Sequence, residues 1–413
     1  SANGADNASN AEHSDDMPTV PIPARKVVTT FDAASRHERL EVKPPLTRLF
    51  RRTITKAFSV WLKFSTALVR SLDWYPRVEP YVGYGTEHYS RLICRTVYGP
   101  FKRQAGRLIR GIRGMLMVPS PHTKVRIAID DVPIETVQVG ASEVYDAIDS
   151  NPDISSEFAA SDDAGYLDLV AEHSLEPGIH NVSYKVRSRK PVNANLFTIP
   201  SGTKVGVISD VDDTIMVTQA PRLMKAAYNL LLLNPRKKVP VASMNLLFNR
   251  IADMFPDAPF FYLSTSPWNV ESSIRHFITN HGFPEGPLLL RDLDPRPKTF
   301  VPSGVQHKLE YAEQLMADFP DMKFILIGDD GQKDPTTYAT IARRYPGRVL
   351  AICIRQLTPR EVAGNIGSVA GRANTQPMPV TDVPVFTGAT GSNIMKTMLP
   401  YLRATQAADG ETD

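Results

Sequence analysis

The chain has 413 residues, 42% of them hydrophobic and 22% charged, which is ordinary for a folded protein of two or three domains. No run approaches the ~18 apolar residues of a membrane-spanning helix, and the two cysteines, Cys94 and Cys353, exclude a disulfide framework and a thiolate metal site. A formal net charge of +3 is too small to indicate a nucleic-acid partner, so we expect none. Few cysteines favour a reducing cytoplasm, although secretion stays open.

The two ends of the chain are rich in small and polar residues. Residues 1–44 predict a disordered tail without the apolar run of a signal peptide, and residues 401–413 predict a second disordered tail. Between Leu46 and Leu72, apolar residues recur at helical spacing and cations recur on another face. This pattern predicts a basic amphipathic helix within residues 45–76, which either packs on the next domain or lies on an anionic membrane surface.

Residues 77–200 contain β-rich runs separated by Pro, Gly, Asn and Asp turns. Alternating apolar positions such as Val125, Ile127 and Ile129 indicate half-buried antiparallel strands. We therefore predict a β-sandwich, interrupted by the basic glycine-rich stretch "GPFKRQAGRLIRGIRG" as a loop or short helix.

Residues 201–400 alternate short apolar strands with helices. The predicted strands are "KVGVIS", "PFFYLS", "PLLLRD", "KFILIG", "RVLAICIR" and "VPVFTG". Nearly continuous apolar strands alternating with helices are typical of an α/β fold with a parallel sheet covered on both faces. In such folds ligands bind beyond the carboxyl ends of the strands.

Aspartates gather at two of these strand ends. They are Asp210, Asp212 and Asp213 after "KVGVIS", and Asp329, Asp330 and Asp334 after "KFILIG". Neighbouring carboxylates would repel one another unless a hard divalent cation lay between them, and carboxylates with waters suit Mg²⁺. Lys308, at a helix start before the second of these strands, is placed to neutralise excess negative charge.

Four short motifs carry a family resemblance. "DVDDT" from Asp210, "YLS" ending at Ser264, Lys308, and "GDDGQKD" from Gly328 resemble, in this order, the motifs of the haloacid-dehalogenase-like phosphatases. The longer stretches "FFYLSTSPWNV" and "FILIGDDGQKDPTTYATIARRYPGRVLAICIR" look more narrowly like the phosphatidate phosphatases named for an actin-patch protein of yeast, and the lipins are similar more distantly. The resemblance covers roughly residues 204–388 and implies a Rossmann-like catalytic domain.

The resemblance also implies roles for the acidic residues. Asp210 would be the nucleophile that forms an aspartyl-phosphate, and Asp212 would be the general acid and then the base for water. Mg²⁺ would be held by Asp210, by the main-chain carbonyl of Asp212 and by Asp329, while Asp334 would orient a metal-bound water. Asp330 is either an outer member of the metal site or a solvated acid.

The remaining motif residues would serve the phosphate. The resemblance implies that Ser264 and Lys308 hold phosphate oxygens, and Thr214, grouped with them, is expected to hydrogen-bond within the motif loop. Asp213 either caps the following turn or takes part in the chemistry.

Other candidate residues have plainer interpretations. His276, His281 and His307 lack metal-ligand spacing, and we expect surface or hydrogen-bonded structural roles for them. Trp268 either lines the site or packs in the core.

The resemblance favours phosphatidate as the substrate. We expect a protein of the cytoplasm, for which peripheral contact with an anionic membrane stays open. A soluble phosphate ester is an alternative substrate, and a phosphatidate-binding module without turnover is an alternative function that the presence of Asp212 opposes. Residues 216–255, apolar and basic together, would either hold a lipid phosphate at a membrane or form two ordinary helices packed on the sheet.

Overall fold

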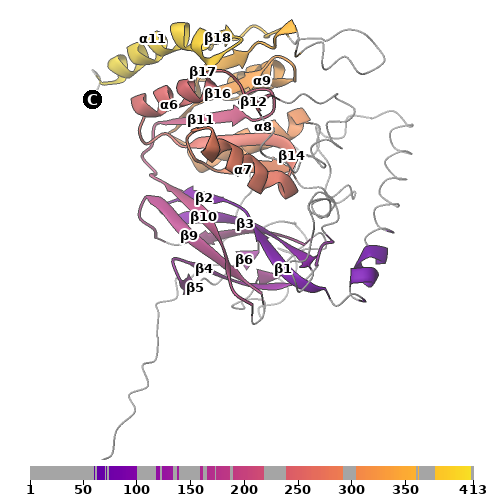
Figure 1. The fold of residues 1–413 in the computed structure, drawn as a ribbon. Helices are drawn as coiled ribbons and strands as arrows, with labels where there is room; N and C mark the ends of the chain where they lie inside the picture. Colours follow the sequence, from indigo (N-terminus) through magenta and orange to yellow (C-terminus); the bar gives the residue numbers. More distant parts are fainter. Residues whose placement is uncertain are drawn as a thin grey trace, which may run out of the picture.

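A computed structural model describes residues 60, 63–69, 71, 74–99, 118–120, 123–133, 137–138, 159–160, 165–172, 174–186, 189–217, 239–291, 304–359, 361 and 377–410. The described chain forms two halves, one built of strands and one in which helices cover a sheet (Figure 1). We call them the β half, residues 75–199, and the α/β half, residues 205–410. The predictions for residues 1–44, for most of the helix within residues 45–76, for the basic glycine-rich stretch and for residues 218–238 of the segment 216–255 lie outside the described residues.

The β half is a hydrogen-bonded sheet of mostly antiparallel strands. Its strands are β1 (Tyr75–Pro80), β2 (Gly83–Thr86), β3 (Tyr89–Gly99), β4 (Lys124–Ile129), β5 (Val132–Pro133), β6 (Val137–Gln138), β7 (Ala159–Ala160), β8 (Tyr166–Glu172), β9 (Gly178–Lys185) and β10 (Val192–Ile199). The order is β5-β4-β9-β10-β2-β3-β8-β6, with β1 on β3 and β7 on β4, and the β10–β2 pair is parallel. The β-rich character is confirmed. The sandwich is not confirmed, because the strands described in this region join in one hydrogen-bonded sheet and a sandwich needs two.

The predicted alternation in this half is confirmed. Val125, Ile127 and Ile129 of β4 are all buried, while the residues between them are more exposed. They pack with Leu92 and Tyr184 in the core of the β half. The two cysteines are buried free thiols, one in each half.

The α/β half contains a six-stranded parallel sheet, as predicted. Its strands are β11 (Val205–Asp210), β14 (Phe260–Pro267), β15 (Leu288–Arg291), β16 (Lys323–Asp329), β17 (Val349–Arg355) and β18 (Val385–Gly388), and all of their pairings are parallel. The order is β15-β14-β11-β16-β17-β18. The chain therefore builds outward from β11 in one direction and then returns to its other side with β16, which is the switch point where ligands bind in such sheets.

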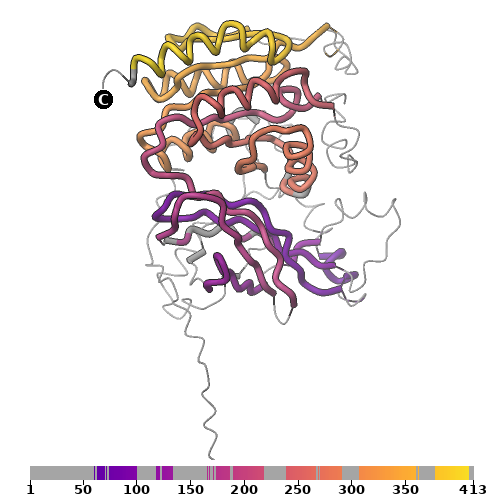
Figure 2. The backbone as a smooth tube through the Cα atoms, turned by 60° about the vertical axis from the view of Figure 1, so that its left-hand side comes forward, coloured from indigo at the N-terminus to yellow at the C-terminus, as the bar shows by residue number. Residues whose placement is uncertain are grey.

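Helices cover both faces of this sheet (Figures 1 and 2). They are α6 (Met244–Met254), α7 (Glu271–Asn280), α8 (Gly304–Asp318), α9 (Asp334–Arg344) and α11 (Gly391–Gly410). Neighbouring strand residues enter opposite cores: Val207 packs with α6, α7 and α11, and Ile208 packs with α8 and α9. Two apolar faces explain why these strands are almost continuously hydrophobic.

The C-terminal end corrects one expectation. We expected a disordered tail over residues 401–413, but α11 continues to Gly410. Leu402 is fully buried and continues the apolar face of Ile394 and Met398, which explains why this turn is ordered.

The two halves are packed together. Tyr84 of β2 is fully buried in the α/β core, where its ring meets the edge of Phe261 at 5.7 Å between centroids. Tyr81, between β1 and β2, stacks on Trp268 at 4.6 Å. Trp268 therefore packs in this contact, which decides between the two roles that its position allowed. Among the described helices, none has the length and hydropathy of a membrane span.

Candidate active site

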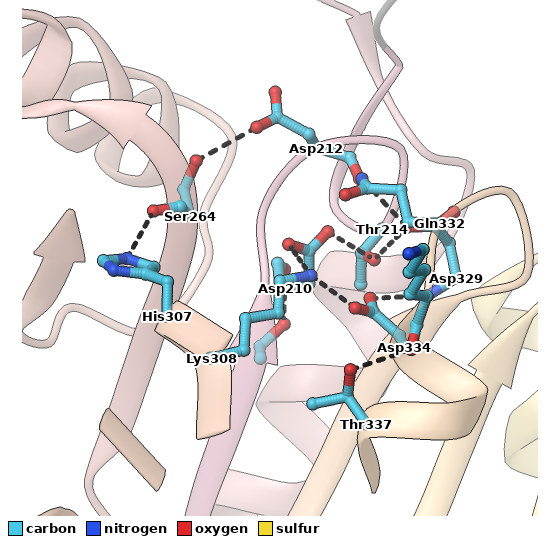
Figure 3. A network of polar contacts seen from close by, with 12 residues as sticks. Asp210, Asp212, Thr214, Ser264, His307, Lys308, Asp329, Gln332, Asp334 and Thr337 are labelled. Carbon is cyan, nitrogen blue, oxygen red and sulfur yellow. Dashed lines mark hydrogen bonds and ion pairs between the residues drawn. The ribbon is translucent and has the colours of Figure 1, made fainter. Parts of the chain in front are cut away.

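The first motif forms a tight loop at the carboxyl end of β11. Asp213 has a left-handed backbone with φ of 62°, a conformation that aspartate tolerates better than most residues. The loop closes through a hydrogen bond from the Asp213 amide to the Met216 carbonyl at 2.8 Å. Because the chain turns here, Asp210 and Asp212 point in different directions and enter different surroundings (Figure 3).

Asp210 is joined by two further aspartates and by a lysine. The carboxylates of Asp210, Asp329 and Asp334 are buried, with oxygen atoms within 4.8 Å of one another. Lys308 Nζ lies 2.6 Å from Asp210 Oδ1 and also binds Asp334 Oδ1. Glycine is required at Gly328, where a Cβ would lie 2.5 Å from Asp334 Oδ2. The structure thus brings together the residues that the sequence places at two strand ends and one helix start.

The charges in this cluster do not cancel. Burial raises the pKa of the Asp210 carboxyl to about 7, although the ammonium of Lys308 acts in the opposite direction. Burial also raises the pKa of Asp329, and the nearby Asp334 and Asp210 add to the rise. For Lys308, burial alone would lower the pKa, but the surrounding carboxylates raise it above its ordinary range. One ammonium thus faces three buried carboxylates, and a further positive charge would stabilise the ionised cluster.

This donor set fits a hard divalent cation. Three buried carboxylates offer oxygen ligands within a small volume, and they come from two neighbouring strand ends and the first turn of α9. Oxygen ligands of this kind suit Mg²⁺ better than metals that prefer nitrogen or sulfur.

Asp212 has a separate environment of hydroxyl groups. Ser264, within β14, donates to Asp212 Oδ2 at 3.0 Å, and Ser266 donates to the same oxygen at 3.4 Å. The amide of Ser266 also donates to the Ser264 hydroxyl at 3.0 Å. Two carboxylates of one loop therefore differ in their partners: Asp210 forms an ion pair with Lys308, and Asp212 accepts hydrogen bonds from the hydroxyl groups of Ser264 and Ser266.

Thr214 and Gln332 connect the two acidic strand ends. Thr214 donates to Asp210 Oδ2 at 3.1 Å, a bond within the motif loop as the sequence predicts. Gln332 donates to the Asp212 carbonyl at 2.9 Å and to Asp329 Oδ2 at 3.3 Å. Sequence reasoning missed Gln332 and Ser266, since no spacing rule distinguishes them from other polar loop residues.

Asp330 and Asp213 do not belong to the group of three clustered carboxylates. Asp330 lies outside the group of three carboxylates, and its Oδ1 accepts a hydrogen bond from the Leu357 amide at 2.9 Å. The carbonyl of Asp213 accepts a hydrogen bond from the buried guanidinium of Arg355 at 2.7 Å. Both residues brace the loops around the site.

The fold and the site together define a class of protein. It is an α/β domain with a parallel sheet, and a buried acidic cluster suited to a cation lies at the carboxyl edge of that sheet. Lys308 and Ser264, which can bind an anion, lie beside the cluster. Residues 205–356 match the family model described as the catalytic domain of phosphatidate phosphatase APP1. The resemblance to this family is thereby confirmed over these residues, and the wider resemblances to haloacid-dehalogenase-like phosphatases and lipins are consistent with it.

Two curated relatives extend the comparison. The chain is 29% identical to "Phosphatidate phosphatase APP1" of Saccharomyces cerevisiae over 208 residues, which are 49% of this chain and 35% of that protein. It is 25% identical to an uncharacterized protein of Schizosaccharomyces pombe over 184 residues, which are 44% of this chain and 30% of that protein. The chain thus spans about a third of the length of the curated relatives it matches. Among solved structures, "Tandem Ig repeats of Dlar" covers 35% of this chain and 62% of its own at 8% identity, and its TM-score of 0.18 supports no conclusion about the fold.

Proposed function

We propose that this protein is a Mg²⁺-dependent phosphomonoester hydrolase whose substrate is phosphatidate, which it converts with water to diacylglycerol and phosphate. The observation that carries the proposal is the separation of two carboxylates on one loop. Asp210 lies beside Lys308 in the buried acidic cluster, and Asp212 lies beside the hydroxyl group of Ser264. Two acids in different environments can perform two different steps.

The reaction would proceed in two displacements. A carboxylate oxygen of Asp210 attacks phosphorus, the bond to the ester oxygen breaks, and Asp212 gives a proton to the leaving alkoxide. Asp212 then takes a proton from water, the water oxygen attacks phosphorus, and the bond to Asp210 breaks. Inorganic phosphate leaves and both carboxyl groups regain their starting states.

Lys308 and Ser264 would bind the phosphate. Among the residues that the structure describes, Asp210 and Asp334 take two of the three donors of the Lys308 ammonium, so the third can meet a phosphate oxygen. The Ser264 hydroxyl has one proton, which it now donates to Asp212. Redirecting that proton to phosphate would leave Asp212 ready to carry its own proton.

Asp210, Asp329 and Asp334 would hold Mg²⁺, directly or through water, together with the main-chain carbonyl of Asp212. When bound, the ion supplies positive charge that offsets repulsion between the nucleophile and the phosphate. Gln332, which bridges Asp212 and Asp329, would hold the two loops at the spacing the ion needs.

The substrate assignment is supported by the family match and by an exposed apolar stripe. Val60, Phe64 and Leu68 recur every four residues in a helical segment and are 67%, 62% and 47% exposed. Lys63 beside them is exposed too. Such a stripe suits peripheral contact with an anionic membrane in the cytoplasm, where phosphatidate would lie within reach.

Phosphate release from phosphatidate in mixed micelles, compared with release from a soluble phosphate ester, tests the proposal. We expect Mg²⁺-dependent release with a clear preference for the lipid. Equal rates on the two substrates would favour the soluble ester, and release from neither would support a binding module.

Sedimentation with vesicles tests the membrane contact separately. Exchanging Val60, Phe64 and Leu68 for serine should reduce binding to vesicles that contain phosphatidate. Unchanged binding of this variant would exclude the stripe from the contact.

A further inference from the structure

Ser264 lies where the sheet no longer holds the chain. The pairing of β11 with β14 ends with Asp210 opposite Leu263. On the other side, the pairing of β14 with β15 breaks after Leu263 and resumes only at Pro267, with a shift of register. The stretch that carries Ser264 is therefore positioned by contacts other than the regular ladder.

His307 supplies one of these contacts. Its Nε2 lies 3.1 Å from the Ser264 carbonyl oxygen, and because a carbonyl only accepts, the imidazole is the donor (Figure 3). The side chain is 5% exposed, so water competes little for this bond. His307 also directly precedes Lys308 in α8, so the same turn of helix carries Lys308 and contacts Ser264.

His307 is itself held in place. The ring of Tyr311, one turn further along α8, meets the imidazole edge to face with centroids 4.9 Å apart. The Tyr311 hydroxyl donates to the Leu290 carbonyl of β15 at 3.2 Å, and Arg91 of β3 lies over the same ring. The imidazole is therefore fixed between the site and the β half.

We propose that His307 is a positioning residue, which holds the backbone of Ser264 so that its hydroxyl can meet the phosphate and Asp212. The inference rests on the proposed function only in taking Ser264 as a phosphate ligand. It gives the β half a part in the site, since Arg91 of β3 lies over the ring of Tyr311, which packs against the histidine that supports Ser264.

Loss of the His307 donor is predicted to weaken phosphate binding without weakening Mg²⁺ binding. His307 contacts Ser264 and does not belong to the group of Asp210, Asp329 and Asp334. His307→Phe keeps a planar ring against Tyr311 but removes the donor. We expect inorganic phosphate to bind about tenfold more weakly to this variant of the 413-residue chain in the presence of Mg²⁺, with Mg²⁺ affinity unchanged.

Conservative variants test the donor itself. His307→Gln places an amide donor near the position of Nε2 and should restore phosphate affinity, whereas the shorter His307→Asn should not. The comparison of His307→Gln with His307→Asn tests the role of the donor even if His307→Phe does not fold. His281→Phe makes the same exchange at a histidine that lies 4.4 Å from the ring of Phe277 and serves as the matched control.

Titration calorimetry with MgCl₂ and then with inorganic phosphate measures both affinities. Phosphate affinity that is equal in wild type, His307→Phe and His307→Asn would overturn the inference, and so would a parallel loss of Mg²⁺ affinity. The proposed function is tested apart from this by phosphate release from the wild-type protein. If the wild type is active and phosphate affinity is unchanged in these variants, the role of His307 is refuted and the proposed function is not.

Discussion

Glu271 lies where the two halves meet, beside Val82 of the β half. The pH dependence of the unfolding free energy tests whether its carboxyl group is buried in this contact. This glutamate begins α7 and is 1% exposed. Its Oε2 accepts a hydrogen bond from Arg275 at 3.1 Å, while Oε1 is buried and has no hydrogen-bond partner among the described residues. Burial raises the pKa of Glu271 from its ordinary 4.5 to about 7, with Arg275 and the Val82 amide acting against the rise.

The direction of the pH effect follows from this shift. Between pH 4.5 and about 7 the folded protein keeps a proton on Glu271 that the unfolded chain has lost. The contribution of Glu271 to stability is therefore fully present below pH 4.5 and is lost as the pH rises through about 7. The difference between the two pKa values corresponds to roughly 3 kcal/mol of unfolding free energy.

Glu271→Gln removes the titration and keeps the shape of the side chain. Any packing cost of the amide is the same at every pH. The informative quantity is therefore how the difference in unfolding free energy between Glu271→Gln and wild type changes with pH. We expect the variant to gain roughly 3 kcal/mol relative to wild type between pH 4.5 and 8, in urea denaturation followed by circular dichroism.

The same exchange at Glu176, an exposed glutamate of the β half, is the control. A difference between Glu271→Gln and wild type that stays constant from pH 4.5 to 8 would refute the reasoning. So would a variant that becomes relatively less stable as the pH rises.

Three further predictions concern the site and the core. Asp212→Asn should lower turnover by about a hundredfold or more, measured by phosphate release, and leave Mg²⁺ affinity near that of wild type, measured by calorimetry. A normal rate of phosphate release would contradict the role of Asp212 as acid and base. Mg²⁺ at a hundred times its dissociation constant should raise the unfolding free energy by about 2.7 kcal/mol, and this gain should disappear in Asp329→Asn. Leu402→Ala should cost about 2–5 kcal/mol because it empties a fully buried position, and a loss below 1 kcal/mol would contradict the packing of α11.

Much of the α/β half could be predicted because its signals are local. Each of the six parallel strands is a short apolar run between turn residues, and burial on both faces leaves little polar alternation to confuse the pattern. Asp210 and Asp329 could be placed together because both end strands of one sheet, and parallel strands bring their carboxyl ends to one edge.

What the sequence did not predict depends on contacts between distant segments. The last turns of α11 have polar residues and follow Pro400 within the helix, so only the packing of Leu402 shows that they are ordered. Gln332 and Ser266 are ordinary loop residues until the two strand ends meet. His307 was expected to have a surface or hydrogen-bonded structural role, and only the irregular end of β14 shows why its bond to Ser264 matters.

The most direct test of the account is Mg²⁺-dependent phosphate release from phosphatidate by Asp210→Asn. The carboxylate of Asp210 is the proposed nucleophile, so the variant should release no phosphate above the uncatalysed rate while still folding like wild type by circular dichroism. Asp257→Asn, the same exchange at an exposed position, is the control and should keep the wild-type rate. Full activity in Asp210→Asn would contradict the central claim.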